Sequence, residues 1–208
     1  MNRIYFIISF VLTSLSFSQI TAITDKGDKV TLNSDGTWHY GTVSQDTNIS
    51  VNDRHYEKDL NSDFFVRSRV ADVGFWIDPT KWKFSKGSSR EEIEYFFEHD
   101  ADELVGFAVV EKTVIPFEMM EEVVVSNAKS GGAQNITINK REFRYVNNNK
   151  ILYLEYTASI YDMPFNFHVY ILSAKNTGTI QFAASTTLDL KNRYLNEIES
   201  FLNGIELY

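Results

Sequence analysis

In the second half of the chain, four mainly apolar segments follow one another and are separated by short polar joints. The segments are residues 136–146, 151–160, 165–172 and 179–187. They are rich in β-branched and aromatic residues, which favour strands. The joints at 147–149, 162–164 and 176–178 are made of residues that favour turns. Because short joints connect strands that run antiparallel, the pattern predicts four consecutive antiparallel strands.

Two further segments carry apolar residues at helical spacing. Residues 116–129 have Pro116 in the first turn, acidic residues near the N-terminal end and Gly131 beyond the last turn, all of which favour a helix. In residues 188–205, one face at helical spacing collects apolar side chains, namely Leu190, Tyr194, Ile198, Phe201, Leu202 and Ile205, and the helix is predicted over 188–203. We therefore predict a mid-chain helix and a C-terminal amphipathic helix that packs on the sheet.

The first part of the chain has shorter elements. Residues 22–40 contain strand-prone stretches around two turns and predict a small β-meander. Residues 44–62 are polar and lack a sustained apolar period, which predicts a linker or, alternatively, a surface loop within one domain. More strands are expected after residue 63, at 64–70, 74–77, 82–84, 92–98 and 104–110.

The order of these elements predicts an α+β fold. An antiparallel β-sheet carries a mid-chain helix and a C-terminal amphipathic helix, and a small N-terminal β-meander precedes it. We expect the meander to occupy residues 19–43, the polar linker 44–62 and the α+β domain 63–208.

The first 18 residues are typical of a signal peptide. Arg3 is followed by an apolar run from Ile4 to Leu15, and Ser16 and Ser18 are the small residues that a signal peptidase reads. The run is too short to span a bilayer. We therefore expect cleavage after Ser18, no stable membrane insertion afterwards, and a periplasmic or secreted protein.

Charge and composition narrow the range of partners. The formal charge is -8 and becomes -9 once Arg3 leaves with residues 1–18, which hold no acidic residue. An acidic chain without a basic cluster does not favour nucleic acid as a partner. The chain has no Cys, so stability depends on a packed core and a thiol nucleophile is excluded.

Two stretches resemble known protein families. The segment VTLNSDGTWHY, residues 30–40, is similar to a segment found in exported proteins of Bacteroidetes-type bacteria. The stretch GFWIDPTKW, with Phe75, Pro79 and Trp82, and the ending IESFLNGIEL resemble the PsbP-like fold over residues 64–207. This resemblance implies an adaptor, binding or assembly factor. The residue pattern here does not match the calcium or manganese roles discussed for the photosynthetic member, and we expect no cofactor.

An acidic loop at residues 98–103 is a candidate metal site. His99, Asp100 and Asp102 lie among four carboxylates, and alternate carboxylates in a turn suit hard cations. The loop lacks the Gly and the distant bidentate Glu that such sites use. A solvated acidic hairpin between two strands explains it equally well.

The four predicted strands also carry polar residues at alternate positions. These residues are Glu142, Arg144, Glu155, Thr157, His168, Tyr170 and Gln181. Several of them could share one face of the sheet, and we predict that Arg144, Glu155, His168, Tyr170 and Gln181 form the floor of a ligand cleft. A His beside a carboxylate can also perform acid–base chemistry. The alternative is a face that meets water, or a His168 that is buried with its hydrogen bonds satisfied.

These observations favour an exported, non-catalytic binding or assembly module of the cell envelope, with an envelope protein or a small ligand as partner. The competing hypothesis is a hydrolase or metal-assisted enzyme that uses His168 with Glu155, or the acidic loop. The enzyme requires a carboxylate within hydrogen-bond reach of His168 inside a pocket, whereas a binding module requires a concave cleft without such a pair.

Overall fold

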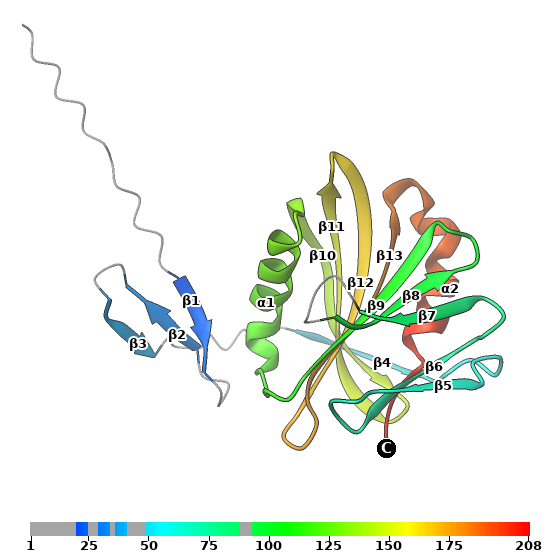
Figure 1. The fold of residues 1–208 in the computed structure, drawn as a ribbon, viewed down its shortest axis with the longest axis horizontal. Helices are drawn as coiled ribbons and strands as arrows, with labels where there is room; N and C mark the ends of the chain where they lie inside the picture. Colours follow the sequence, from blue (N-terminus) through cyan, green and yellow to red (C-terminus); the bar gives the residue numbers. More distant parts are fainter. Residues whose placement is uncertain (1–19, 25–28, 34–35, 41–48, 88–92) are drawn as a thin grey trace, which may run out of the picture.

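The computed structural model describes residues 20–24, 29–33, 36–40, 49–87 and 93–208. The predicted signal peptide and its cleavage site lie outside these ranges. Figure 1 shows a small N-terminal sheet followed by the main α+β body. The small sheet contains β1 (Ile20–Ile23), β2 (Lys29–Leu32) and β3 (Trp38–Tyr40), each antiparallel to the next. The strands of the predicted meander are thereby confirmed.

A sheet of eight strands forms the centre of the main body. Its spatial order is β4 (Ser50–Tyr56), β10 (Gln134–Val146), β11 (Asn149–Ile160), β12 (Met163–Ala174), β13 (Gly178–Thr187), β9 (Leu104–Glu111), β8 (Ile93–His99) and β7 (Trp82–Lys86). The four strands predicted from the second half of the chain are confirmed as consecutive antiparallel neighbours, β10 to β13.

Tight turns set the register of these strands. Asn147 and Asn148 join β10 to β11 with φ of 47° and 64°, and Asn tolerates this left-handed conformation better than most residues. Tyr161 and Asp162 join β11 to β12 with φ of 50° and 63°. The turn predicted at 162–164 is therefore misplaced, because Pro164 lies inside β12 and pairs with Ser159.

The polar linker predicted at 44–62 is wrong for its central part. Residues 50–56 form β4, which pairs in parallel with β10 at the edge of the central sheet. Five of the seven β4 residues are exposed and Tyr56 is buried, so the strand shows no apolar alternation by which the sequence could reveal it. β4 also makes the sheet mixed rather than purely antiparallel. The domain boundary at residue 63 stays a prediction. Because β4 pairs with β10, it belongs to the central sheet of the main body although it precedes this boundary in the chain.

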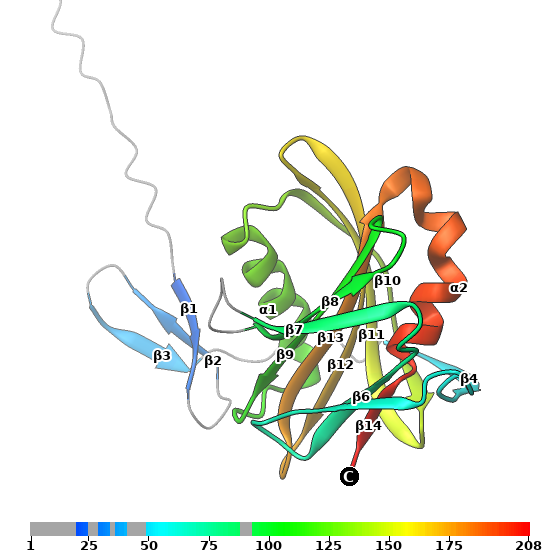
Figure 2. The ribbon, with the colours of Figure 1, turned by 45° about the vertical axis from the view of Figure 1, so that its right-hand side comes forward.

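The two faces of the central sheet are covered by different elements (Figures 1 and 2). Helix α1 (Phe117–Ser130) covers one, here called the α1 face. The other, the α2 face, is covered by α2 (Lys191–Leu202), which follows the short 3-10 helix η1 (Leu188–Leu190), and by a three-stranded sheet. That sheet contains β5 (Phe64–Arg67), β6 (Val73–Ile77) and β14 (Ile205–Leu207). Both predicted helices are confirmed.

Aromatic side chains fix α2 on its face. The ring of Phe201 stacks on Trp82 with centroids 3.9 Å apart and contacts Phe182 at 4.5 Å. Gly106 of β9 makes this approach possible, because a Cβ at that position would lie 2.6 Å from Cε1 of Phe201. Within the described part of the chain, no helix has the length and apolar character needed to cross a membrane.

Candidate functional site

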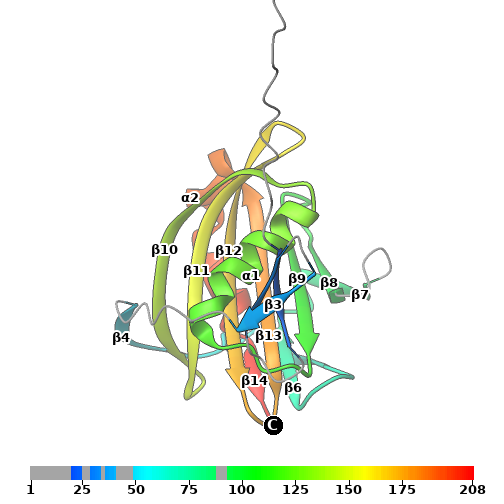
Figure 3. The ribbon, with the colours of Figure 1, turned by 90° about the vertical axis from the view of Figure 1, so that its left-hand side faces the viewer.

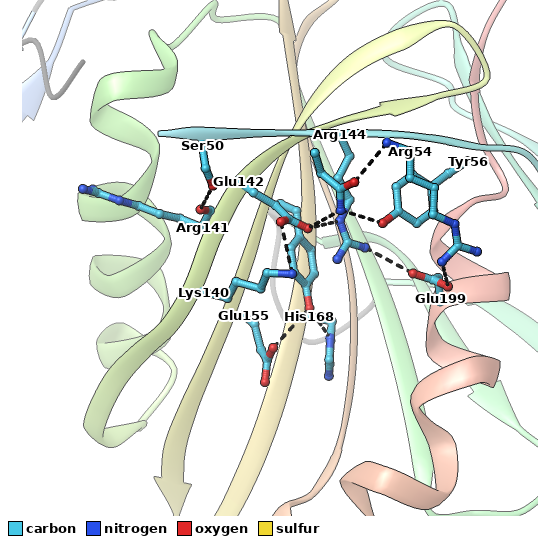
Figure 4. Close-up of polar contacts among 12 residues, drawn as sticks. Ser50, Arg54, Tyr56, Lys140, Arg141, Glu142, Arg144, Glu155, His168 and Glu199 are labelled. Atoms are coloured by element: carbon cyan, nitrogen blue, oxygen red, sulfur yellow. Dashed lines mark hydrogen bonds and ion pairs between the residues drawn. The ribbon is translucent and has the colours of Figure 1, made fainter. Parts of the chain in front are cut away.

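Strand register brings most of the predicted ligand-binding residues together on the α2 face. Glu142 pairs with Tyr153, Glu155 with His168, and Tyr153 with Tyr170. Paired residues of an antiparallel sheet point to the same face. We call the resulting group the polar cluster: Glu142, Arg144, Tyr153, Glu155, Asn166, His168 and Tyr170, with Lys191, Glu199 and Asn203 from α2 and its C-terminal end. Figure 4 labels Glu142, Arg144, Glu155, His168 and Glu199 of this cluster.

Arg144 joins one half of this cluster. Its Nε donates to Glu142 Oε1 at 2.7 Å, and its Nη1 donates to the hydroxyl of Tyr170 at 3.0 Å. The guanidinium lies 3.6 Å from the ring centroid of Tyr153 and 3.5 Å from Glu199 of α2. Burial alone would raise the pKa of Glu142, but hydrogen bonds from Arg144 and other donors keep it below its ordinary value. The buried charges therefore compensate each other, which a buried charge requires.

His168 stands in the other half, with both ring nitrogens occupied. Nδ1 lies 2.7 Å from the hydroxyl of Tyr153, and Nε2 lies 2.6 Å from the amide oxygen of Asn166. Because an amide oxygen can only accept, Nε2 carries the proton in the neutral ring and Nδ1 accepts from Tyr153. Burial raises the pKa of Tyr153 far above its ordinary value, so this phenol keeps the proton that it donates.

Glu155 faces His168 across β11 and β12, but its hydrogen bonds go elsewhere. Its Oε1 accepts from Lys191 of α2 and, at 3.3 Å, from Asn166 Nδ2. Burial alone would raise the pKa of Glu155, but the hydrogen bond and charge of Lys191 hold it below its ordinary value. Burial lowers the pKa of His168 to about 4, helped by the charges of Lys191 and Arg144 and opposed by Glu155.

The polar cluster is closed rather than open to a substrate. None of its strand residues is more than 8% exposed, and His168 is 2% exposed. His168 is neutral near pH 7 and has no ring nitrogen left for a substrate proton. Glu155 is likewise engaged by Lys191 and Asn166. This arrangement fits the alternative considered for His168, a buried histidine with satisfied hydrogen bonds.

Sequence reasoning missed five members of the cluster: Tyr153, Asn166, Lys191, Glu199 and Asn203. Tyr153 lies two residues before Glu155, and Asn166 lies two residues before His168, so strand alternation places each beside a residue that was predicted. Lys191 begins α2, and only the docking of that helix brings it to Glu155.

Gln181 does not belong to the polar cluster. On β13 it pairs with Ile171 of β12 and Val109 of β9, so it points to the α1 face, away from His168 and Tyr170. There it lines a groove between α1 and the sheet. The predicted set therefore divides, with Arg144, Glu155, His168 and Tyr170 on one face and Gln181 on the other.

The groove, here called the α1 groove, has a volume of about 790 Å³. Figure 3 shows α1 lying across the face of the sheet. The helix contacts β10, where Phe117 packs edge-on against Phe143 and Glu121 pairs with Arg141 at 3.2 Å. The groove continues over β8, β9, β12 and β13. Apolar side chains dominate its lining and include Val105, Phe107, Val109, Val124, Phe167 and Val169.

Gln181 is the main polar feature in the floor of this groove. Its side chain is 4% exposed, yet its Nε2 has no hydrogen-bond partner among the residues that the structure describes. A buried amide without a partner carries a desolvation cost of about 1–3 kcal/mol. The groove thus combines a volume in the range of small-molecule sites with a polar group that is not satisfied internally.

In the acidic loop, two of the three predicted metal ligands lie close together, since Nδ1 of His99 is 3.1 Å from Oδ1 of Asp100. His99 turns inward, is 8% exposed, packs edge-on against Trp82 and accepts a hydrogen bond at Nδ1 from the Ala101 amide at 3.1 Å. The side chain of Asp100 is 59% exposed, and Asp102 sits in the turn with φ of 56°. Over the described ranges, no three His, Asp or Glu side chains are grouped so that they could hold a metal ion.

Comparison with known proteins identifies the fold. No protein-family model and no curated protein sequence matches the chain. The solution structure of the cyanobacterial PsbP protein CyanoP from Synechocystis sp. PCC 6803 is similar, with a TM-score of 0.51 and 14% identity over 70% of this chain and 92% of CyanoP. The structure of LpqN, involved in cell envelope biogenesis of Mycobacterium tuberculosis, gives a TM-score of 0.45 and 8% identity over 69% of this chain and 89% of LpqN.

The CyanoP match shows that the main body has a PsbP-like α+β fold, as the sequence resemblance implied. At 14% identity, the likeness concerns the fold and carries no assignment of residues.

Proposed function

We propose that the protein is an exported, non-catalytic binding module of the cell envelope, and that it binds its ligand in the α1 groove. The observation that carries the proposal is the groove itself, a mainly apolar concavity of about 790 Å³ between α1 and the central sheet. Small-molecule sites are concave, mostly apolar and of this size, with few polar groups.

The polar cluster supports the non-catalytic part of the proposal. A general base needs an accessible nitrogen and a pKa near the working pH. His168 has two occupied nitrogens and a pKa lowered to about 4 by burial. The residues that looked most suited to acid–base chemistry therefore serve to hold α2 on the sheet. The geometry does not favour the hydrolase alternative.

A fluorescence titration tests binding in the groove. 1-Aminoanthracene is a neutral, apolar fluorophore whose emission increases when it leaves water. We expect saturable binding to the wild-type protein and a loss of affinity of about tenfold or more in Ala128→Trp, because the indole would fill the groove that Ala128 lines.

Glu118→Trp is the matched control, since Glu118 is an exposed residue of the same helix outside the lining of the groove. It should bind the fluorophore as the wild type does. Absence of saturable binding, or equal affinity in the two Trp variants, would contradict the proposed site.

Export rests on the pattern in residues 1–18 and is tested separately. Expression of the full chain in a Gram-negative host, followed by intact mass of the product from the periplasm or medium, should show a protein that begins at Gln19. A cytoplasmic product that retains residues 1–18 would refute this part.

A further inference from the structure

The α1 groove has a chemical asymmetry that restricts what it can bind. Most of its lining is apolar, whereas β13 contributes two polar residues, Gln181, whose buried Nε2 lacks a partner within the described structure, and Ser185 farther along the strand. We propose that the ligand is an uncharged amphiphile; this inference rests on the proposed function, binding in the α1 groove. Its apolar chain covers the groove floor, and its carbonyl or ester oxygen accepts a hydrogen bond from the Gln181 amide.

The unpaired amide indicates an acceptor on the ligand. Gln181 is fixed by the pairing of β13 with β9 and β12, so its side chain cannot leave the α1 face without breaking the register. Its buried Nε2 has no hydrogen-bond partner among the described residues. A ligand oxygen placed there would remove the cost of the unsatisfied N–H, whereas a pure hydrocarbon would leave that cost in place.

The charges around the groove favour a neutral head over an ionised one. Two charged residues, Lys86 and Glu98, are among those that line it, and both side chains are exposed. Gln181 itself is 4% exposed. A carboxylate brought to Gln181 would be buried, whereas the one cation among the described lining residues, Lys86, is exposed on β7, so such burial is costly. An ester, ketone or amide carbonyl can reach the amide without that cost.

The geometry also gives the ligand a direction. Gln181 and Ser185 are four residues apart on β13, which corresponds to about 13 Å along the strand. Val124 and Ala128 of α1 form the opposite wall. A carbonyl bound at Gln181 therefore lies beyond the reach of Ser185, and the attached chain has the apolar floor between them.

Displacement of bound 1-aminoanthracene tests this assignment with three probes of equal chain length: methyl decanoate, decanoate and decane, each below its aggregation limit. In the wild type we expect methyl decanoate to displace the fluorophore at concentrations about tenfold lower than either of the other probes. In Gln181→Met, which keeps the unbranched shape and removes the donor, the advantage over decane should disappear while decane itself binds as before.

Ser185→Ala is the control for loss of a polar group in the same groove, and it should keep the tenfold preference. Equal displacement by the three probes in the wild type would overturn the inference. An unchanged preference for methyl decanoate over decane in Gln181→Met would also overturn it, as would an equal loss of that preference in Gln181→Met and Ser185→Ala. In each of these results the fluorophore still binds, so the proposed site stands. Failure of the fluorophore to bind, or equal binding by Ala128→Trp and Glu118→Trp, refutes the site itself. Thermal unfolding of Gln181→Met verifies that the variant is folded.

Discussion

Helices α2 and α1 cover opposite faces of one sheet, but they contact it in different ways. Under α2, Phe201 reaches Trp82 and uses the space left by Gly106, and the polar groups beside this core bond to one another. Under α1, contacts with β10 leave a groove of about 790 Å³ over the neighbouring strands. A polar atom in its floor has no partner among the described residues.

The difference shows how one sheet can separate stability from binding. On the α2 face, close packing and the hydrogen bonds within the polar cluster stabilise the fold. The α1 face keeps room and an unsatisfied donor that stability alone does not require, and such features are expected at functional sites.

The largest expected effect comes from a charge placed under each helix. Ile198 of α2 is 1% exposed, so Ile198→Asp should lower the free energy of unfolding by about 3–5 kcal/mol, because the carboxylate would be buried without a partner. Val124→Asp on α1 should cost less than half as much, because Val124, although only 4% exposed, lines the α1 groove, and the volume of about 790 Å³ leaves room for water around the carboxylate. Urea unfolding monitored by circular dichroism measures both.

Asn196→Asp is the matched control, because it adds the same charge at an exposed position of α2. It should change the free energy of unfolding by no more than about half a kcal/mol. Equal losses in Ile198→Asp and Val124→Asp would mean that the two helices pack alike and would break the comparison.

Removal of the Asn166 side-chain amide, which is hydrogen-bonded within the polar cluster, should have the next largest effect on the free energy of unfolding. Asn166 accepts from His168 Nε2 and donates to Glu155. Asn166→Leu leaves both of those buried groups short of a partner and should therefore cost about 2–4 kcal/mol. Chemical denaturation of the variant and of Thr187→Val, a change at the partly buried end of β13, provides the comparison. A loss below about 1 kcal/mol in Asn166→Leu would show that the cluster contributes little.

The polar cluster should also make stability depend on pH. Unfolded His168 has an ordinary pKa of about 6.5, whereas burial lowers it to about 4 in the folded protein. Between these values the unfolded state binds more protons, so the free energy of unfolding falls as pH decreases from about 6.5, by about 3 kcal/mol at pH 4. Glu142 and Glu155, whose pKa values are lowered, add a loss only at pH values below their ordinary range.

Urea titrations at several pH values between 5 and 6.5 isolate the histidine contribution. His168→Gln should flatten the curve in this window, whereas His55→Gln, at an exposed position of β4, should leave it unchanged. An identical slope in wild type and His168→Gln would mean that the imidazole is not held neutral by the cluster.

The smallest effect on stability is expected for the side-chain amide of Gln181, whose Nε2 has no hydrogen-bond partner among the described residues. Gln181→Met removes a buried donor that has no partner in the described structure, so it should leave stability unchanged or raise it by up to about 1 kcal/mol. Calorimetric melting would measure this. A loss comparable to that of Asn166→Leu would show that Gln181 contributes to stability as the cluster residues do, and the contrast between the faces would vanish.

Local patterns determined the strands, the helices and the order of the main body. β10 to β13 could be predicted because β-prone segments and turn residues such as Asn147 and Asn148 act over a few residues. The apolar face of α2 follows from helical spacing, and its members Tyr194, Ile198 and Phe201 are buried. β4 escaped prediction because it is a mostly exposed edge strand, and its partner β10 lies far along the chain.

The composition of the candidate site was decided by tertiary structure. Alternation along one strand is visible in the sequence, but which positions of two strands share a face depends on register. The two-residue turn of Tyr161 and Asp162 places Glu155 opposite His168, whereas the longer turn between Ala174 and Gly178 pairs His168 with Ala184. Ala184 thus shares the face of His168. Gln181 lies an odd number of residues before Ala184 on β13 and therefore points to the α1 face. A change of one residue in the length of the turn between β12 and β13 would shift this register by one position and would place Gln181 on the α2 face with the polar cluster.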